Sequence, residues 1–148
     1  MTWSDDGDVA GACLETYVML RAYHDSALPE ELSAALGLSP STSARVGSTE
    51  NPLGLPLGQS VWSLSSKGVV LSRDCRIHID WLIGRLRGKG RDVSRLQEAG
   101  WEFDLMVPWT RGGYGGPYLM PDQMTFLGRL GLPVWFPIHV DDGRGDQA

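Results

Sequence analysis

Apolar and polar residues alternate along three segments of the chain, which is the period of strands that bury one face. The segments are CLETYVMLRAYH (13–24), WEFDLMVPW (101–109) and LPVWFPIHV (132–140). QSVWSLSS (59–66) is also strand-like, and ARVGS (44–48) can add a short edge strand. The residues predicted to face inward are Leu14, Thr16, Val18, Leu20 and Ala22 in the first segment, Trp101, Phe103, Leu105, Val107 and Trp109 in the second, and Leu132, Val134, Phe136, Ile138 and Val140 in the third.

Helical signals separate these strands. SALPEELSAALGL (26–38) has Pro29 in its first turn and ends at Gly37, the usual placement of both residues. DCRIHIDWLIGRL (74–86) gives the clearest helix, and RDVSRLQEAG (91–100) and MPDQMTFLGRLG (120–131) predict two more. The apolar stripe of the clearest helix consists of Cys75, Ile79, Leu82, Ile83 and Leu86.

These elements favour an α+β fold, with a single-layer, mostly antiparallel sheet and helices on one face. A ferredoxin-like split β-α-β with an added α-β unit fits their order best. The 148 residues suit one domain. We expect a folded core over about 13–141, acidic flexible tails at 1–11 and 142–148, and a loop at 47–58 whose order the sequence leaves open.

Charge and cysteine content point to the cytoplasm. The net charge is −5, and the first ten residues are acidic where an export signal is basic. No apolar run approaches the ~20 residues that span a bilayer. The only cysteines, Cys13 and Cys75, fall in a predicted strand and a helix start, which suits a reducing compartment. We therefore expect a soluble cytoplasmic protein without a membrane partner.

Taken in order, several pieces of the chain resemble one family. They are LPEELSAALGLSPSTSARVG, VWSLSS, IHIDWLIGRL, GWEFDLMVPW, a glycine-rich loop and LGLPVWFPIHV. Together they resemble the bacterial domain-of-unknown-function family numbered 4279 over about residues 13–141. The resemblance implies a small α+β domain found in bacterial cytoplasm, with no settled activity. NPLGLPLGQ (51–59) is richer in proline and leucine than the family pattern.

The glycine-rich stretch WTRGGYGGPYLMPDQ (109–123) invites comparison with phosphate-binding loops. It holds no Lys for a Walker loop, and Tyr118 stands where a dinucleotide fingerprint needs its third glycine. Asp122 also opens the following helix, where its carboxylate already occupies the position favourable to an anion. We interpret the stretch as a strand-to-helix crossover whose glycines allow positive φ, with a contact surface as the alternative.

Catalytic and metal motifs are missing from the sequence. No HExxH or paired CxxC occurs, and GQSVW breaks the G-x-S-x-G pattern at its last position. His78 is placed on the polar side of its helix, and His24 and His139 at strand ends that could meet only if their strands were neighbours. Cys75 lies between Arg73 and Arg76, which could lower its pKa, but its place on the apolar stripe favours packing. We assign no catalytic, cofactor or metal residues.

One basic run, RLRGKGRDVSR (85–95), stands out in this acidic chain. It is typical of a solvated join between two helices, with Arg85 and Arg87 near a helix C-terminus, where positive charge is favourable. An RNA backbone or an acidic partner is the alternative. The acidic balance disfavours nucleic acid as a partner.

The outward face of the last strands is the strongest functional signal. It combines Pro133, Trp135, Pro137 and His139 with the outward residues of segment 101–109, Glu102, Asp104, Met106 and Pro108. We expect an open, weakly polar sheet face, with prolines that block further edge pairing. The candidate contact residues are Trp109, Arg111, Tyr114, Tyr118, Trp135 and His139.

The leading hypothesis is a non-enzymatic protein-binding module of the immunity or adaptor type, with an unknown protein partner or a second copy of the chain. The alternative is a small-ligand binder or minor hydrolase that uses the glycine-rich loop 109–121. Its pocket would lie between the 47–58 loop and the glycine-rich loop, with Arg111, Tyr114 and His24 as polar contacts.

Overall fold

Eight strands and four helices make up the part of the chain that the computed structural model describes, residues 12–141. The expected tails at 1–11 and 142–148 lie outside the described residues. The strands are β1 (Cys13–Thr16), β2 (Met19–His24), β3 (Thr42–Ala44), β4 (Ser60–Ser65), β5 (Glu102–Met106), β6 (Trp109–Arg111), β7 (Val134–Trp135) and β8 (Ile138–Val140). The helices are α2 (Pro29–Leu36), α3 (Cys75–Leu86), α4 (Gly90–Glu98) and α5 (Pro121–Arg129).

The strands form two sheets, of five and three strands. The larger has the order β3-β4-β2-β5-β7, and the smaller has the order β1-β6-β8. Neighbours are antiparallel except for β5–β7 and β6–β8, which are parallel. The α+β class is confirmed, but the expected single sheet is wrong, because the described strands divide into two.

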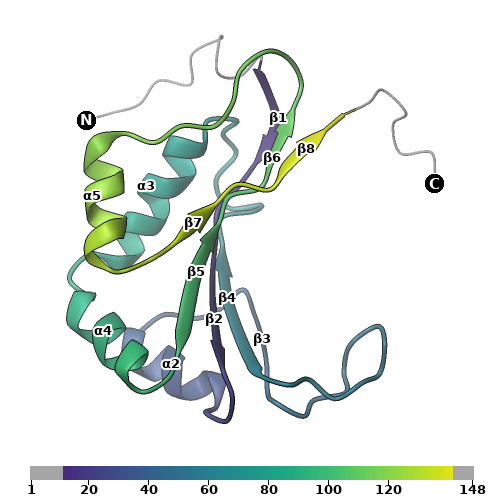
Figure 1. The fold of residues 1–148 in the computed structure, drawn as a ribbon, viewed down its shortest axis with the longest axis vertical. Helices are drawn as coiled ribbons and strands as arrows, with labels where there is room; N and C mark the ends of the chain where they lie inside the picture. The colour runs from purple at the N-terminus through teal and green to yellow at the C-terminus, as the bar shows by residue number, and fades with distance from the viewer. Residues whose placement is uncertain (1–11, 142–148) are drawn as a thin grey trace.

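The division occurs where three long segments each break into two strands (Figure 1). Pro108 and Pro137 lie at two of the breaks and have no N–H to donate to a ladder. At the same level the Thr16 hydroxyl donates to the Pro108 carbonyl, at 2.8 Å. Prolines at the breaks of two segments, and a side-chain hydrogen bond from the third segment, therefore separate the two ladders.

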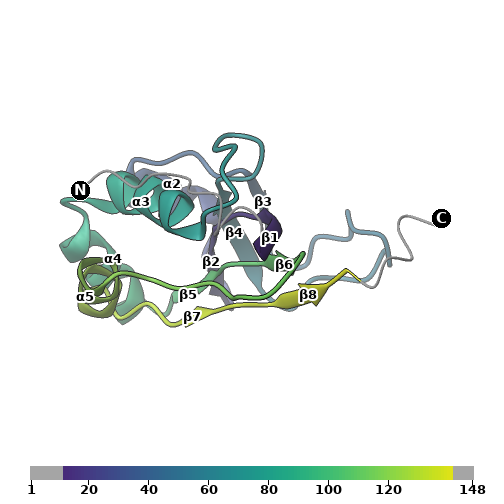
Figure 2. The same cartoon turned by 90° about the horizontal axis from the view of Figure 1, so that it is seen from above.

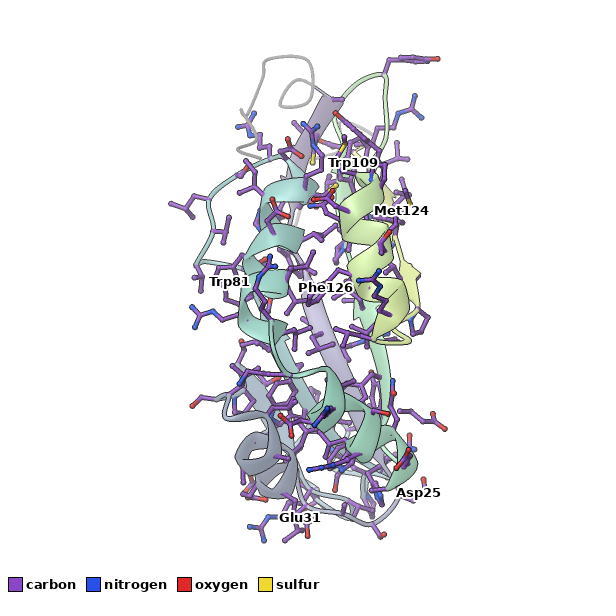
Figure 3. All side chains as sticks on the ribbon, turned by 90° about the vertical axis from the view of Figure 1, so that its left-hand side faces the viewer. Asp25, Glu31, Trp81, Trp109, Met124 and Phe126 are labelled. Atoms are coloured by element: carbon purple, nitrogen blue, oxygen red, sulfur yellow. The ribbon has the colours of Figure 1, made fainter. Side chains whose placement is uncertain are left out.

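All four helices lie on the same side of the sheets (Figures 1 and 2). Figure 3 looks onto this helical layer, with Phe126 and Met124 on α5 and Trp81 on α3. The core between helices and sheet contains Leu20, Leu32, Trp62, Ile79, Leu82 and Leu105, each no more than 1% exposed. None of the four described helices lies over the opposite side of the larger sheet, as the alternating pattern predicted.

The alternation is confirmed for 101–109, where all five predicted residues are buried. It is wrong at Leu14, which is 43% exposed, because β1 has an irregular register between Cys13 and Glu15. It is also wrong at Ile138 and Val140, which are 50% and 58% exposed. Both follow the break at Pro137, on the outermost strand of the smaller sheet.

Candidate functional site

The open face of the larger sheet is built from side chains that alternate with the core residues. On β2 these are Met19, Arg21 and Tyr23, which are half-buried, whereas Leu20 and Ala22 between them are buried. The register places Arg21 beside Asp104 of β5, Tyr23 beside Glu102, and Met19 beside Met106. Because paired residues in a sheet point to the same side, these rows form one surface, and Trp135 of β7 continues the Met106 row.

Arg21 and Asp104 form the polar centre of this face. The guanidinium donates two parallel hydrogen bonds, Nε to Oδ1 at 2.8 Å and an Nη to Oδ2 at 2.6 Å. The hydrogen bond to Asp104 raises the pKa of Arg21 above its already high value, so the guanidinium keeps its charge. The bidentate geometry fixes its plane as well as its position.

Two aromatic rings flank this guanidinium. Its central carbon lies 5.2 Å from the ring centroid of Trp135 and 5.8 Å from that of Tyr23. Both distances are within the range of cation–π attraction. Trp135 remains 46% exposed, so the face presents a large aromatic surface that a charged neighbour holds in place.

The remaining predicted contact residues do not gather on this face. Trp109 is 2% exposed and packs with Ala12 and Cys13, so its ring is not part of the surface of this structure. Arg111 bonds locally, with Nε donating to the Gly113 carbonyl at 2.8 Å. Tyr114 is 96% exposed. His139 is exposed on β8, in the other sheet.

Tyr118 packs the glycine-rich loop against α3. Its ring lies 4.5 Å from the guanidinium carbon of Arg76, and its carbonyl accepts from Cys75 Sγ at 3.5 Å. Of the loop glycines, Gly115 has a positive φ of 130°. A Cβ at Gly112 would lie 2.6 Å from Leu14 Cγ. Backbone conformation and close packing therefore account for two of the four glycines.

A shallow apolar groove of about 370 Å³ runs between this loop, α5 and β7. It is lined by Pro117, Tyr118, Leu119, Met124, Leu127, Gly128, Leu132, Val134 and Phe136. The expected pocket between the 47–58 loop and the glycine-rich loop does not form, because the two loops lie at opposite ends of the structure (Figure 1).

The prolines of the last strand do not block its free edge. The carbonyls of Pro133, Trp135 and Pro137 all accept from the β5–β6 side, from Leu105, Val107 and Trp109. Since successive residues of a strand direct their N–H and C=O groups to opposite sides, the Pro133 and Pro137 nitrogens face inward. The sequence-based expectation is corrected: the prolines interrupt the inner ladder, and the outer edge keeps its donors.

His78 is buried, contrary to its predicted place on a polar face. It is 1% exposed, with Nδ1 2.6 Å from Ser66 Oγ and Nε2 2.7 Å from the Ser72 carbonyl. A carbonyl can only accept, so Nε2 carries the proton and Ser66 donates to Nδ1. Ser66 Oγ also accepts from the Val18 N–H. These hydrogen bonds join His78 to the segment that precedes α3 and to β4's end, which is a structural role.

His24 and His139 do not meet. The strands that carry them, β2 and β8, belong to different sheets, and the end of β2 that leads to α2 lies at the opposite end of the fold from β8 (Figure 1). His24 Nδ1 accepts from the N–H groups of Ser26 and Ala27, and Nε2 lies 2.8 Å from the Ala99 carbonyl. His24 therefore stabilises the turn that follows β2.

Cys75 packs as a small apolar residue, as its position in the stripe predicted. It is 2% exposed, and burial raises its pKa to about 11. The alternative of a lowered pKa is wrong, because desolvation outweighs the nearby Arg76 charge. The thiol is therefore protonated at neutral pH in the folded protein.

Sequence reasoning missed the exposed leucines of the loop that joins β3 and β4. Leu53 and Leu55 are 80% and 61% exposed, and the segment between β3 and β4 that contains them extends on the side away from the helices (Figures 1 and 2). The loop is ordered by its own hydrogen bonds, including Gly47 N–H to Leu57 O and Leu57 N–H to Ser48 O. The run of Pro, Gly and Leu was the available signal.

The basic run 85–95 contacts aromatic rings of its own chain. Arg85 lies over Trp81 at 5.1 Å and Arg87 over Phe126 at 5.9 Å. Within residues 12–141 no helix is long and apolar enough to cross a bilayer. The same residues contain no group of three His, Cys, Asp or Glu side chains placed to hold a metal ion.

Comparison with known proteins agrees with the resemblance read from the sequence. No curated protein and no solved structure shows significant similarity to this chain. A family model does match, over residues 14–141, and its description is a domain of unknown function, DUF4279. The match spans nearly the whole chain, which therefore belongs to the DUF4279 family.

Proposed function

We propose that this chain is a non-enzymatic protein-binding module of the immunity or adaptor type, and that its open sheet face receives the partner. The observation that carries the proposal is Trp135, 46% exposed and stacked on the Arg21–Asp104 pair. Aromatic and arginine side chains dominate the energy of protein interfaces. Here they are already held in one conformation, so binding costs little side-chain entropy.

The exposed leucines add to the same side of the molecule. Leu53 and Leu55 stand on an ordered loop that projects on the helix-free side (Figure 2). Exposed leucine gains nothing for folding, since it remains in water in the free protein. A partner that covers both the sheet face and this loop would bury aromatic and aliphatic side chains together with Arg21, and aromatic residues and arginine are enriched at interfaces.

The test compares capture of a partner by matched variants. The tagged wild-type protein is expected to retain one protein in stoichiometric amount from native lysate. Trp135→Ala should lose it, because the central aromatic anchor is gone. Leu71→Ala is the control, since Leu71 is 91% exposed but lies in a different loop, between β4 and α3. If no protein is retained, or both variants retain it equally, the proposal fails.

A second candidate is a small apolar ligand in the groove beside the glycine-rich loop. The supporting observation is the groove itself, whose volume of about 370 Å³ is within the range of small-molecule sites. Arg111, Tyr114 and His24 do not line it, so the ligand would be held by apolar contacts with Leu119, Met124 and Phe136. A ligand at saturating concentration would raise the melting temperature, and Met124→Glu would abolish that shift.

We also propose that the fold is a ferredoxin-like split β-α-β with an added α-β unit. The strand order β3-β4-β2-β5, with antiparallel neighbours throughout, supports this proposal. So does the final α5–β7 unit, which adds a parallel strand beside β5. An experimental structure superposed on that topology tests it.

A further inference from the structure

The outer edge of β7–β8 presents an unbroken row of backbone groups. The carbonyls of Pro133, Trp135 and Pro137, at every second residue, all point towards β5 and β6. This alternation continues through the break between the two sheets. The N–H and C=O groups of Val134, Phe136, Ile138 and Val140 therefore point away from β5 and β6. β7 and β8 are the terminal strands of their sheets, so no strand of the described residues pairs with this edge.

This edge lacks two of the features that normally protect an edge strand, charged side chains and outward-facing prolines. Segment 132–140 contains no Lys, Arg, Asp or Glu, and its two prolines have their nitrogens on the inner side. Natural sheets place charges or outward-facing prolines at such positions to prevent pairing between chains. An uncharged edge with all its outer donors is suited to receive another strand.

Two apolar features beside this edge are incomplete in a single chain. The groove between α5 and β7 is not enclosed, and Val134 and Phe136 of this edge segment are part of its lining. Farther along the same edge, Ile138 and Val140 are half exposed or more. One end of the strand therefore lacks side chains to fill its groove, and the other end has aliphatic side chains without cover.

We propose that a second copy of this chain binds this edge, with the two β7–β8 segments antiparallel about a two-fold axis at Pro137. In this register Phe136 lies opposite the partner's Ile138, and Val134 lies opposite the partner's Val140. Residues directly opposite in an antiparallel pair have side chains on the same face. The exposed aliphatic residues of each copy thus cover the groove of the other.

The remaining pairs are also compatible. Trp135 lies opposite the partner's His139 on the open face, and no two like charges meet, because the segment has no formally charged residue. Such an isologous contact closes on itself and adds no further free edge at this site. It also joins the larger sheet of each copy to the smaller sheet of the other, because β7 lies opposite β8 of the second copy.

The inference is independent of the proposed function, because it concerns the edge and a second copy of the chain. Sedimentation across micromolar to millimolar concentration should give the mass of a dimer for the wild-type protein. Ile138→Lys should give a monomer, since a buried amine would face Phe136 of the other copy. Leu71→Lys, at an exposed aliphatic residue in the β4–α3 loop, should remain a dimer. A monomeric wild type, or a dimer that tolerates Ile138→Lys, overturns the inference.

Cross-linking tests the register. At a two-fold centred on residue 137, Pro137→Cys faces its own copy in a non-hydrogen-bonded pair, where Cα atoms are close enough for a disulfide. Mild oxidation should therefore give a covalent dimer. Ser43→Cys, exposed on the opposite edge strand β3, should not cross-link. Equal cross-linking of the two variants overturns the register. Capture of a partner by a protein that does not dimerise would contradict this inference alone. Dimerisation without capture of a partner would contradict the proposed function alone.

Discussion

Arg21 and Asp104 face each other across β2 and β5, on the side of the sheet that none of the helices in residues 12–141 covers, and are joined by two hydrogen bonds. Their side chains are 23% and 27% exposed, so water screens the pair only in part. The pair also holds the guanidinium against Trp135. One polar interaction therefore determines the conformation of the residues that we assign to the interface.

A double-mutant cycle of Arg21→Gln and Asp104→Asn should show a coupling energy of about 1 kcal/mol, since bidentate, partly buried pairs exceed the usual surface value. The measurement is urea unfolding of the two single variants and the double variant. The control is the cycle for Arg45 and Glu30, whose side chains are 61% and 62% exposed, and its coupling should be smaller. Equal coupling energies in the two cycles would show that partial burial on the open face adds nothing to the Arg21–Asp104 interaction.

Much of the fold could be predicted from local pattern. The alternation in 101–109 placed five residues in the core, and the stripe of α3 placed Cys75 and Ile79 there. These patterns suffice because helix and strand periods directly determine which side chains share a face. The division into two sheets could not be predicted in this way, since it depends on where Thr16 meets Pro108, 92 residues apart.

The candidate site shows the same limit. Trp135 could be assigned to an open face by alternation, but its contact with Arg21 depends on the order of strands, which local sequence does not determine. His78 appears polar by helical period, yet Ser66 and Ser72 of the preceding segment bond both of its nitrogens. Leu53 and Leu55 appear to belong to an irregular loop, and only the cross-loop hydrogen bonds make them a defined surface.

His78→Phe should lower the free energy of unfolding by about 2–4 kcal/mol. The ring keeps its volume, but the partly buried Ser72 carbonyl loses its donor and the buried Ser66 hydroxyl loses its acceptor. Urea unfolding measures the change. His139→Phe, at an exposed position, is the matched control and should stay within about 0.5 kcal/mol of the wild type. Similar losses in both variants would argue against the buried network.

Cys75 should make the protein less stable at alkaline pH. Its pKa is about 11 in the folded chain against 9.0 for a free thiol, so the unfolded chain loses the proton first. The stability linked to this group is complete below pH 9 and is lost as the pH rises towards 11, by about 2–3 kcal/mol in all. Cys75→Ala should remove this part of the slope in unfolding experiments from pH 8 to 11. Parallel slopes for the two proteins would contradict the assignment.

Gly112→Ala should destabilise the protein by about 1–3 kcal/mol, the usual cost of overpacking. The new Cβ would lie 2.6 and 2.7 Å from Cγ and Cδ2 of Leu14. The backbone cannot move away freely, because the Gly112 N–H donates to the Ala12 carbonyl at 2.9 Å. Gly116→Ala is the control in the same loop, since no atom lies within 4 Å of its Cβ position and its φ is not positive.

Rescue separates steric conflict from a general effect of glycine on the loop. If the clash with Leu14 is the cause, adding Leu14→Ala to Gly112→Ala should recover most of the lost stability, because the atoms in conflict are removed. Leu14 is 43% exposed, so its truncation alone should cost less than truncation of a core leucine. A double variant that loses the sum of both single effects would show that Gly112 is required for backbone conformation, and that its contact with Leu14 is incidental.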